Sequence, residues 1–423
     1  MTDSTPSAQA SHVVIIGAGM VGVSCALWLQ RAGHRVTLLD PRGPAGGASQ
    51  GNAGVLAAGS VVPVTVPGLL GKAPGMLLDK AAPLFVRWSY LPKLLPFLAR
   101  YLRHGNVRDV NRIADALTHL LHDAYDQHMA LAAGTGAEKY LSPGDYVFAY
   151  PDRAAYENDA FGWSIRRAHE VEFEEMAPDR IAEYDPLLAG RAGFAVRCGN
   201  HGRVSDPGEY VRTLAQHVVS QGGRLIETSV KDIRIENGQA TGVITETEPI
   251  EANHVVLTSG VWSGELAQRL GLKVPMEAEG GYHIEWVNPT MAPRSPTMVA
   301  AGKFVLTPMD GRLRSAGVLE FGGINDKRTQ AALNLLKTQT KALLPELSCD
   351  RVDEWMGFRP APADSIPLIG PTGAVQNAWV GFGHHHVGLT SGPKTGRWLA
   401  QLIDKTLPAA ELSAFSPDRF RVT

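Results

Sequence analysis

Apolar runs interrupted by glycine open the chain and predict a strand, a helix and a second strand. Residues 13–16 (VVII) are apolar and β-branched, which is typical of a buried parallel strand. Residues 20–32 follow as a helix that Gly33 closes. Residues 35–40 (RVTLLD) predict the second strand. This order is that of a βαβ unit.

Residues 84–104 combine a helical apolar stripe with basic side chains. The stripe repeats at alternating steps of four and three and consists of Leu84, Trp88, Leu91, Leu95, Leu98 and Leu102. Pro92 and Pro96 are expected to divide it into two short helices. Two interpretations stay open: the helices cover the domains as a lid, or they form an interfacial patch that meets a membrane or a redox partner. Residues 108–131 predict one further amphipathic helix.

The rest of the chain alternates helices with groups of strands. Asp206 is a predicted N-cap, with Pro207 in the first turn, for a helix that runs to about Gln221. Strands are predicted at RLIET, VKDIRIE, ATGVITE and HVVLTSG, and in antiparallel order at YHIEWV, KFVLTP, LRSAGVLEFG and RVDEWMGFRP. A strand at AWVGF and a helix through Leu402 end the pattern. We expect an α/β fold, with a Rossmann-like domain and a second α+β domain built on a mostly antiparallel sheet.

Composition and charge narrow the class of protein. The chain has 423 residues, of which 44% are hydrophobic and 19% charged, as expected for two or three globular domains. The net charge of −2 gives no general attraction to nucleic acid, and none is expected as a partner. The three cysteines are scattered, which disfavours a disulfide framework or a zinc site and suits a reducing compartment. The N-terminus has no signal-peptide pattern, so we expect a cytoplasmic protein, peripheral on the inner membrane only if residues 84–104 touch it.

The first strand and helix enclose a glycine motif with a specific chemical use. Gly17 allows the tight turn, Gly19 lets backbone amides approach a pyrophosphate, and Gly22 lets the helix pack closely on the strand. The helix N-terminus supplies partial positive charge to phosphate groups. Asp40, at the end of the second strand, is placed to bind both ribose hydroxyls. Together these features predict a dinucleotide site.

The segments after Asp40 favour FAD over NAD. An NAD dehydrogenase normally continues with further βα units, whereas here a long loop rich in Gly, Ala and Asn follows. Later segments, TSGVWSG at 258–264 and GFGHHHVGLTSGP at 381–393, look like returning pieces of the same site. A site built from pieces of the whole chain suits a long cofactor buried along its length. An NAD-binding protein remains the alternative.

Five motifs carry a resemblance to a known family: VVIIGAGMVGVSCALWLQRAGHRVTLLD, GASQGNAGVLAAG, TSGVWSGEL, WMGFRPAPADSIPLIG and GHHHVGLTSGPKTG. In this order they resemble the flavin-dependent D-amino-acid dehydrogenase group. The wider family includes D-amino-acid oxidase, glycine oxidase and sarcosine oxidase. The resemblance covers residues 12 to 404 and implies a discontinuous FAD-binding domain and a substrate-binding domain. The expected boundaries are 12–83, 205–265 and 352–423 for the first and 106–204 and 266–351 for the second, with 84–105 as a separate helical segment.

The resemblance also implies which residues hold FAD. Gly17, Gly19, Gly22 and Asp40 match the ADP-binding positions, and Arg42 matches a basic residue near the adenosine. Val230 matches a backbone contact to adenine. The loop that passes the pyrophosphate and the flavin ring is matched by Ser49, Asn52, Ala53, Gly54 and Val55. A wall of the FAD channel is matched by Gly260 and Trp262. The start of the last helix is matched by Gly388, Leu389 and Thr390. No cysteine occurs in WMGFRP, where some relatives attach the flavin, so we expect non-covalent FAD.

Substrate contacts are implied in the same way. Arg359 matches the family's carboxylate-binding arginine, and a planar guanidinium can hold a carboxylate at two points. Tyr282 and His283 match a strand that lines the substrate pocket, and they can equally be an ordinary strand pair. His384 and His386 are candidates to line the flavin ring. A metal cluster of histidines is not expected, because neighbouring histidines alternate in direction and no nearby acid completes a ligand set.

These residues imply oxidation of a D-amino acid, including D-proline or a hydroxyproline, by hydride transfer from the α-carbon to flavin. The expected partners are a small-molecule amino acid and an electron acceptor, a quinone or another component of the respiratory chain. Two alternatives stay open: an oxygen-using amine oxidase that acts on glycine or sarcosine, and one subunit of a heteromeric amino-acid dehydrogenase complex.

Overall fold

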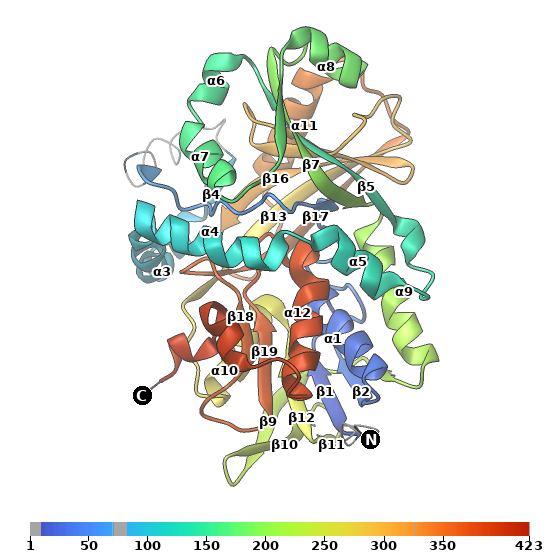
Figure 1. Cartoon of the computed structure of the whole chain (residues 1–423), viewed down its shortest axis with the longest axis vertical. Coiled ribbons are helices and arrows are strands. Elements are labelled where there is room, and N and C mark those ends of the chain that lie inside the picture. Colours follow the sequence, from blue (N-terminus) through green and yellow to red (C-terminus); the bar gives the residue numbers. More distant parts are fainter. Residues whose placement is uncertain (1–9, 70, 72–82, 326, 423) are drawn as a thin grey trace, which may run out of the picture.

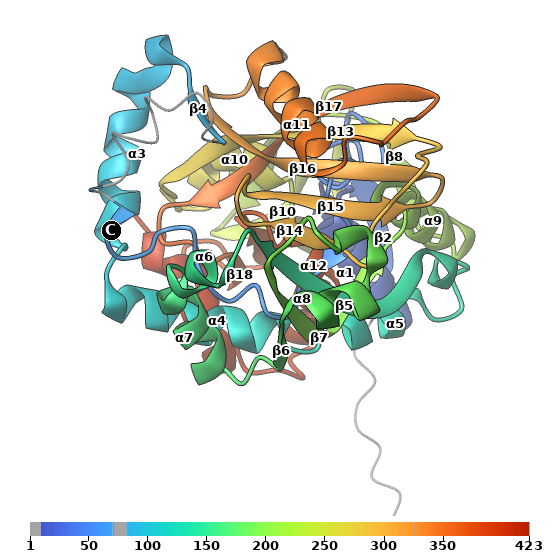
Figure 2. The same ribbon diagram turned by 90° about the horizontal axis from the view of Figure 1, so that it is seen from above.

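The computed structural model describes residues 10–69, 71, 83–325 and 327–422. A mostly parallel sheet occupies the lower part of Figure 1 and a larger mixed sheet the upper part. Helix α4 (Val107–Leu121) runs across the middle of that view. Seen from above in Figure 2, α3 (Leu91–Arg103) and α7 (Ala160–Ala168) lie at one side of the molecule.

The six-stranded sheet confirms the predicted βαβ unit. Its order is β18 (Leu368–Pro371), β19 (Ala378–Phe382), β12 (His254–Leu257), β1 (His12–Ile16), β2 (Arg35–Leu39) and β8 (Arg224–Ile226). Neighbouring strands are parallel except β18 and β19. Apolar side chains of β1 and β2 pack in the core with those of α1 (Met20–Arg31), α9 (Pro207–Ser220) and α12 (Gly388–Ile403).

The ten-stranded sheet is mostly antiparallel, as predicted. Its main path runs β17 (Arg351–Pro362), β13 (Met276–Val287), β16 (Arg312–Phe321), β15 (Phe304–Met309), β14 (Thr297–Val299), β5 (Leu141–Tyr150), β7 (Phe194–Val204) and β3 (Val55–Leu56), with β4 (Leu84–Val86) beside β16 and β6 (Phe173–Met176) beside β7. Strand β13 is buried on both faces. Tyr282, Ile284 and Trp286 pack in one core with the apolar side chains of α11 (Gln330–Leu343).

The remaining elements connect and cover these sheets. A three-stranded sheet has the order β11 (Pro249–Glu251), β10 (Gln239–Thr245) and β9 (Val230–Glu236). The other α-helices are α5 (Ala124–Ala132), α6 (Arg153–Glu157), α8 (Pro178–Tyr184) and α10 (Ser263–Arg269). The 3-10 helices are η1 (Trp88–Tyr90), η2 (Glu138–Tyr140), η3 (Pro186–Leu188), η4 (Gly260–Trp262), η5 (Ala409–Phe415) and η6 (Pro417–Phe420). Within the described part of the chain, no helix is long and apolar enough to cross a membrane.

The prediction for residues 84–104 was wrong in its local structure. The segment forms β4, η1 and one continuous helix, α3, which contains Pro96. Pro92 lies in the first turn, where a missing N–H is tolerated, and Pro96 removes only the bond to the carbonyl of Pro92. Packing compensates for that loss, because α3 buries a face made of Leu94, Phe97 and Tyr101.

The predicted helix over 108–131 was also wrong, because two helices, α4 and α5, replace it. The break lies at His122 and Asp123. Asp123 lies between the two helices, and its carboxylate accepts hydrogen bonds from Lys394 Nζ (2.8 Å) on α12 and from Gln127 Nε2 (2.7 Å). Satisfying the buried Lys394 ammonium gives this break a physical reason.

The predicted domain boundaries stay a prediction. The strands of the six-stranded sheet do come from three separated parts of the chain. Strand β17 nevertheless pairs with β13 along its whole length and so belongs to the ten-stranded sheet.

Candidate active site

A cavity of about 1250 Å³ lies between the two large sheets. Its walls come from the turn after β1, the loop at 47–55, strands β13 and β17, helix α3 and the start of α12. Most of the residues matched to FAD binding line it: Gly17, Gly19, Asp40, Arg42, Ser49, Asn52, Ala53, Val55, Val230, Gly260, Trp262, Gly388, Leu389 and Thr390. The fold therefore brings segments from both ends of the chain to one space.

The three glycines of the first motif have different physical reasons. Gly17 adopts a φ of +105°, which other residues rarely reach. A Cβ at Gly22 would lie 1.9 Å from the Gly17 carbonyl oxygen, so only glycine lets α1 approach β1 this closely. A Cβ at Gly19 would meet only Ser49 Oγ, at 3.4 Å. Gly19 therefore leaves open space on the cavity side, whereas Gly22 acts in packing and does not line the cavity.

Asp40 is held firmly at the end of β2. Its two carboxylate oxygens accept hydrogen bonds from the N–H of Ala18 (3.0 Å) and of Arg42 (2.9 Å). The Arg42 guanidinium lies 3.9 Å from the centre of the Trp262 ring, a cation–π contact that orders the cavity wall. The buried Thr228 hydroxyl lines the same region and has no hydrogen-bond partner among the residues that the structure describes. A bound polar molecule would satisfy it.

The loop after α1 is fixed by its own side chains. Ser49 Oγ accepts the N–H of Met20 (3.0 Å), and Asn52 Oδ1 accepts the N–H of Gly54 (2.9 Å). Gly54 has a φ of +74°, and a Cβ there would lie 2.6 Å from the Val204 carbonyl oxygen. Gly54 thus shapes the loop without lining the cavity, a correction to its expected direct contact.

The N-terminus of α12 opens on the cavity. No side chain caps it, so the N–H groups of Gly388, Leu389 and Thr390 remain free to interact with a bound group. Its first turn is supported by His128, which donates from Nε2 to the Leu389 carbonyl (2.9 Å). Nδ1 of the same ring accepts from the Tyr210 hydroxyl (2.9 Å), and burial lowers the pKa of His128 to about 4. A neutral imidazole in one tautomer therefore positions this turn.

These features fit a flavin dinucleotide. The open space at Gly19, the unpartnered Thr228 hydroxyl and the uncapped α12 provide positions for phosphate, polar and negatively charged groups, respectively. No cysteine occurs among the residues that line the cavity. Over the described ranges of the chain, no group of three or more His, Cys, Asp or Glu side chains could hold a metal ion.

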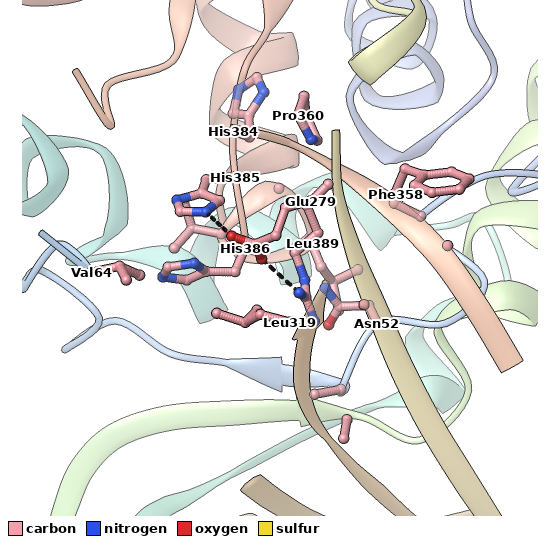
Figure 3. A pocket seen from close by; sticks show the side chains of 18 of the residues that line it. Asn52, Val64, Glu279, Leu319, Phe358, Pro360, His384, His385, His386 and Leu389 are labelled. Carbon is pink, nitrogen blue, oxygen red and sulfur yellow. Dashed lines mark hydrogen bonds and ion pairs between the residues drawn. The ribbon is translucent and has the colours of Figure 1, made fainter. Parts of the chain in front are cut away.

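Arg359 and the buried Glu279 form the polar centre of the cavity. Figure 3 shows Glu279 beside His385. Arg359 donates from Nη1 to Glu279 Oε1 (2.7 Å), and His385 Nε2 lies 2.7 Å from Glu279 Oε2. Glu279 is 1% exposed. Burial alone would raise the pKa of Glu279, but His385 and Arg359 outweigh it and hold that pKa well below its usual range. The acid is therefore a carboxylate at neutral pH.

The guanidinium of Arg359 keeps free donors on its cavity side. Glu279 is its one hydrogen-bond acceptor among the described residues. The group lies over Gly281, where a Cβ would come within 2.6 Å of Arg359 Cζ. The remaining N–H groups are thus available for a ligand, and carboxylate binding by Arg359 stays a prediction.

His384 and His386 both line the cavity, and their place beside the flavin ring stays a prediction. Burial lowers the pKa of His384 to about 3, and its Nε2 lies 3.0 Å from Thr395 Oγ1. His386 projects its ring into the cavity, whose walls enclose it and lower the pKa of its imidazole. Both rings are therefore neutral near pH 7.

Tyr282 and His283 do not line the cavity, a correction to their expected role there. The Tyr282 hydroxyl donates to Glu320 and accepts the N–H of Thr329 (3.1 Å) within the core under α11. His283 stacks behind Trp355, with ring centres 5.0 Å apart, and its Nδ1 lies 3.1 Å from the Gly51 carbonyl oxygen. Strand alternation explains Tyr282, which faces away from Glu279 and Gly281.

Two polar residues of the site, Glu279 and His385, were missed in the sequence. The available signal was alternation along β13, which places Glu279 on the same face as Gly281. His385 is not among the predicted site residues, because alternation of neighbouring side chains would turn it away from His384 and His386. It adopts instead a φ of +48°, which turns the chain so that all three histidines line the cavity.

Comparison with known proteins agrees with this geometry. A family model described as FAD dependent oxidoreductase matches residues 12–402. The chain belongs to this family. A D-amino-acid oxidase of Bradyrhizobium diazoefficiens is 38% identical over 419 residues, which cover 97% of this chain and 99% of that relative. The resemblance, the fold class and FAD as the cofactor are therefore confirmed, as is an oxidoreductase that acts on amino acids.

Solved structures of the FAD dependent oxidoreductase family share this fold. Glycine oxidase from Geobacillus kaustophilus superposes with a TM-score of 0.73 at 21% identity, covering 97% of this chain and 99% of its own. L-proline dehydrogenase from P. horikoshii gives 0.71 at 19% identity, covering 97% and 98%. At such identities the agreement concerns the fold alone.

Proposed function

We propose that this enzyme oxidises D-amino acids, with D-proline and hydroxyprolines among the candidates, and that Arg359 binds the substrate carboxylate. The observation that carries the proposal is the Arg359 guanidinium, which is fixed by Glu279 and keeps free donors toward the cavity. The 38% identity to a D-amino-acid oxidase supports the substrate class. Non-covalent binding of FAD is part of the same proposal, supported by the absence of cysteine from the cavity lining.

The residues of the chain perform two tasks in this reaction. Arg359 holds the carboxylate at two points, which fixes the position of the α-carbon. The start of α12 supplies partial positive charge where negative charge develops on the cofactor side. When bound, FAD would supply the electron-accepting chemistry for the hydride that leaves the α-carbon. The proton of the substrate amine leaves to solvent, so no side chain is required as a strong base.

Apolar side chains close the cavity on the side of α3. Leu94, Leu98 and Leu102 line it there, and Leu319 and Phe321 line the nearby sheet. This wall favours an apolar or cyclic substrate side chain and keeps water away from the reacting carbon.

The proposed electron acceptor is a quinone or another component of the respiratory chain. The exposed side of the α3 region supports contact with a membrane, because Trp88 is 63% and Leu95 55% exposed. Lys93, Arg100 and Arg103 lie on the same helix and favour an anionic surface.

A panel of amino acids tests the substrate class. FAD-loaded protein is mixed anaerobically with D- and L-amino acids, both prolines, hydroxyprolines and glycine, and loss of yellow colour is recorded. The proposal predicts bleaching by D-forms. Bleaching by L-forms alone, by glycine alone, or by none would refute it. Reoxidation by a soluble quinone without peroxide supports the acceptor, whereas rapid peroxide formation in air identifies an oxidase.

A further inference from the structure

The charges around Arg359 do not balance once a carboxylate binds there. Glu279 is shared between Arg359 Nη1 and His385 Nε2, each at 2.7 Å. Glu279 is 1% and His385 7% exposed, so water screens this cluster weakly. With a neutral His385 and no ligand, the charges of the guanidinium and the carboxylate cancel. A second carboxylate on Arg359 therefore leaves one uncompensated negative charge, which is costly in a buried site.

The titratable and charged neighbours of His385 come from four elements. Tyr101 on α3 meets the imidazole edge-on, with ring centres 6.4 Å apart. His386 follows in the same loop, with ring centres 4.5 Å apart, while Arg359 on β17 and Glu279 on β13 complete the cluster.

Tyr101 and His386 are unsuited to take up a proton that would balance the added negative charge. Burial, together with the charge of Glu279, raises the pKa of Tyr101, so its phenol is already protonated and neutral. His386 is exposed within the cavity, and the enclosing walls together with the adjacent His385 lower the pKa of its imidazole, so protonation there is unfavourable. His385 has a direct carboxylate partner in Glu279 and is the neighbour best placed to carry a positive charge.

We propose that His385 takes up a proton when a carboxylate binds Arg359, and that Glu279 couples the two groups. Glu279 is then a positioning residue that makes carboxylate affinity depend on the protonation of His385. The inference rests on the proposed role of Arg359 as the carboxylate anchor. It does not require that the bound carboxylate be oxidised.

The proposal predicts how carboxylate affinity depends on pH in the wild type and in each variant. In the wild type, carboxylate affinity falls about tenfold per pH unit once His385 is deprotonated in the free enzyme. His385→Asn removes the titrating group, so affinity is weaker at low pH and no longer varies there. Asparagine suits the positive φ of His385. Glu279→Gln leaves the Arg359 charge uncompensated, so binding needs no proton and is also independent of pH.

Calorimetry of FAD-loaded protein with propionate, in two buffers of different ionisation enthalpy at one pH, measures the proton uptake. Up to about one proton per site is expected in the wild type near neutral pH. None is expected in His385→Asn or Glu279→Gln, and uptake should persist in His386→Gln. Retained flavin colour reports that each variant is folded.

Four results would overturn the inference: no propionate binding to the wild type, binding without proton uptake, uptake unchanged in His385→Asn, or uptake lost in His386→Gln instead. Failure of the proposed function can be distinguished from failure of this inference. If D-amino acids do not bleach the flavin but propionate binds with the predicted pattern, the coupling stands for another carboxylate ligand.

Discussion

Arg359 and Glu279 are directly opposite each other on the antiparallel strands β17 and β13, and the Arg359 guanidinium donates a 2.7 Å hydrogen bond to the Glu279 carboxylate. The register of two long, paired strands thus sets the position of the group proposed to bind the substrate carboxylate. A charged pair with this support loses little further freedom when a ligand binds, which is the condition for accurate positioning of an α-carbon.

Replacing Arg359 tests its role in carboxylate binding. Arg359→Lys keeps a positive charge but removes the planar, two-point donor, so KM should rise by roughly tenfold to a hundredfold. Steady-state kinetics with the best D-amino acid measures the change. Arg351→Lys, at the exposed start of the same strand, is the matched control and should leave KM unchanged. Equal KM values for all three proteins would contradict the assignment.

Gly281 is expected to be essential for the orientation of Arg359. In Gly281→Ala the new methyl group would lie 2.6 Å from the guanidinium carbon, which forces that group to move. Propionate affinity should fall at least tenfold while flavin content stays near normal, since Gly281 lies at the substrate end of the cavity. Gly199→Ala, on strand β7 with no atom within 4 Å of its Cβ position, is the control. Undiminished propionate affinity in Gly281→Ala would show that Arg359 is not held in this way.

Burial of His128 is expected to make the free energy of unfolding depend on pH in the acid range. Its folded-state pKa is lowered by burial to about 4, from 6.5 in the unfolded chain. Between these values the unfolded chain binds a proton that the folded chain excludes, so the free energy of unfolding falls as pH falls below about 6.5. At pH 5 the loss amounts to roughly 2 kcal/mol.

Urea unfolding at pH 7 and pH 5 checks this expectation. The loss of stability should be smaller by about that amount in His128→Gln, which cannot titrate. His122→Gln, at an exposed position, is the control. The same acid-dependent loss in His128→Gln and the wild type would refute the assignment.

The exposed apolar side chains near α3 make a prediction about membranes. Trp88→Glu with Leu95→Glu should abolish sedimentation with anionic lipid vesicles while flavin content stays unchanged, because both side chains point to solvent. Val219→Glu, 45% exposed on α9, is the matched control. Leu98 is left intact, since it packs against the core and lines the cavity. Vesicle binding that survives the double change would exclude this contact.

The sequence predicted best the features whose geometry is set by neighbouring residues in the chain. Gly17, Gly22 and Asp40 lie within one βαβ unit, so the motif itself specifies their geometry. Arg359 and the start of α12 followed from the family resemblance. These parts cover most of the cofactor end of the cavity.

The rest depends on contacts between distant parts of the chain. Glu279 is 80 positions from Arg359 and 106 from His385, so no local pattern reveals that it joins them. Helix α3 continues through Pro96 because its face packs near Phe321 and β17, which local proline preference does not include. The prediction that Tyr282 lines the pocket was wrong for a local reason. The family resemblance identifies the strand, but it does not tell which of the alternating side chains face the pocket.

The most direct measurement is a crystal structure of the FAD-loaded enzyme with a bound, unreactive carboxylate analogue of a D-amino acid. The account predicts that both carboxylate oxygens contact the free N–H groups of Arg359, with Glu279 still bound to its Nη1. A carboxylate bound elsewhere in the cavity, or an Arg359 side chain turned away from the cofactor, would contradict it.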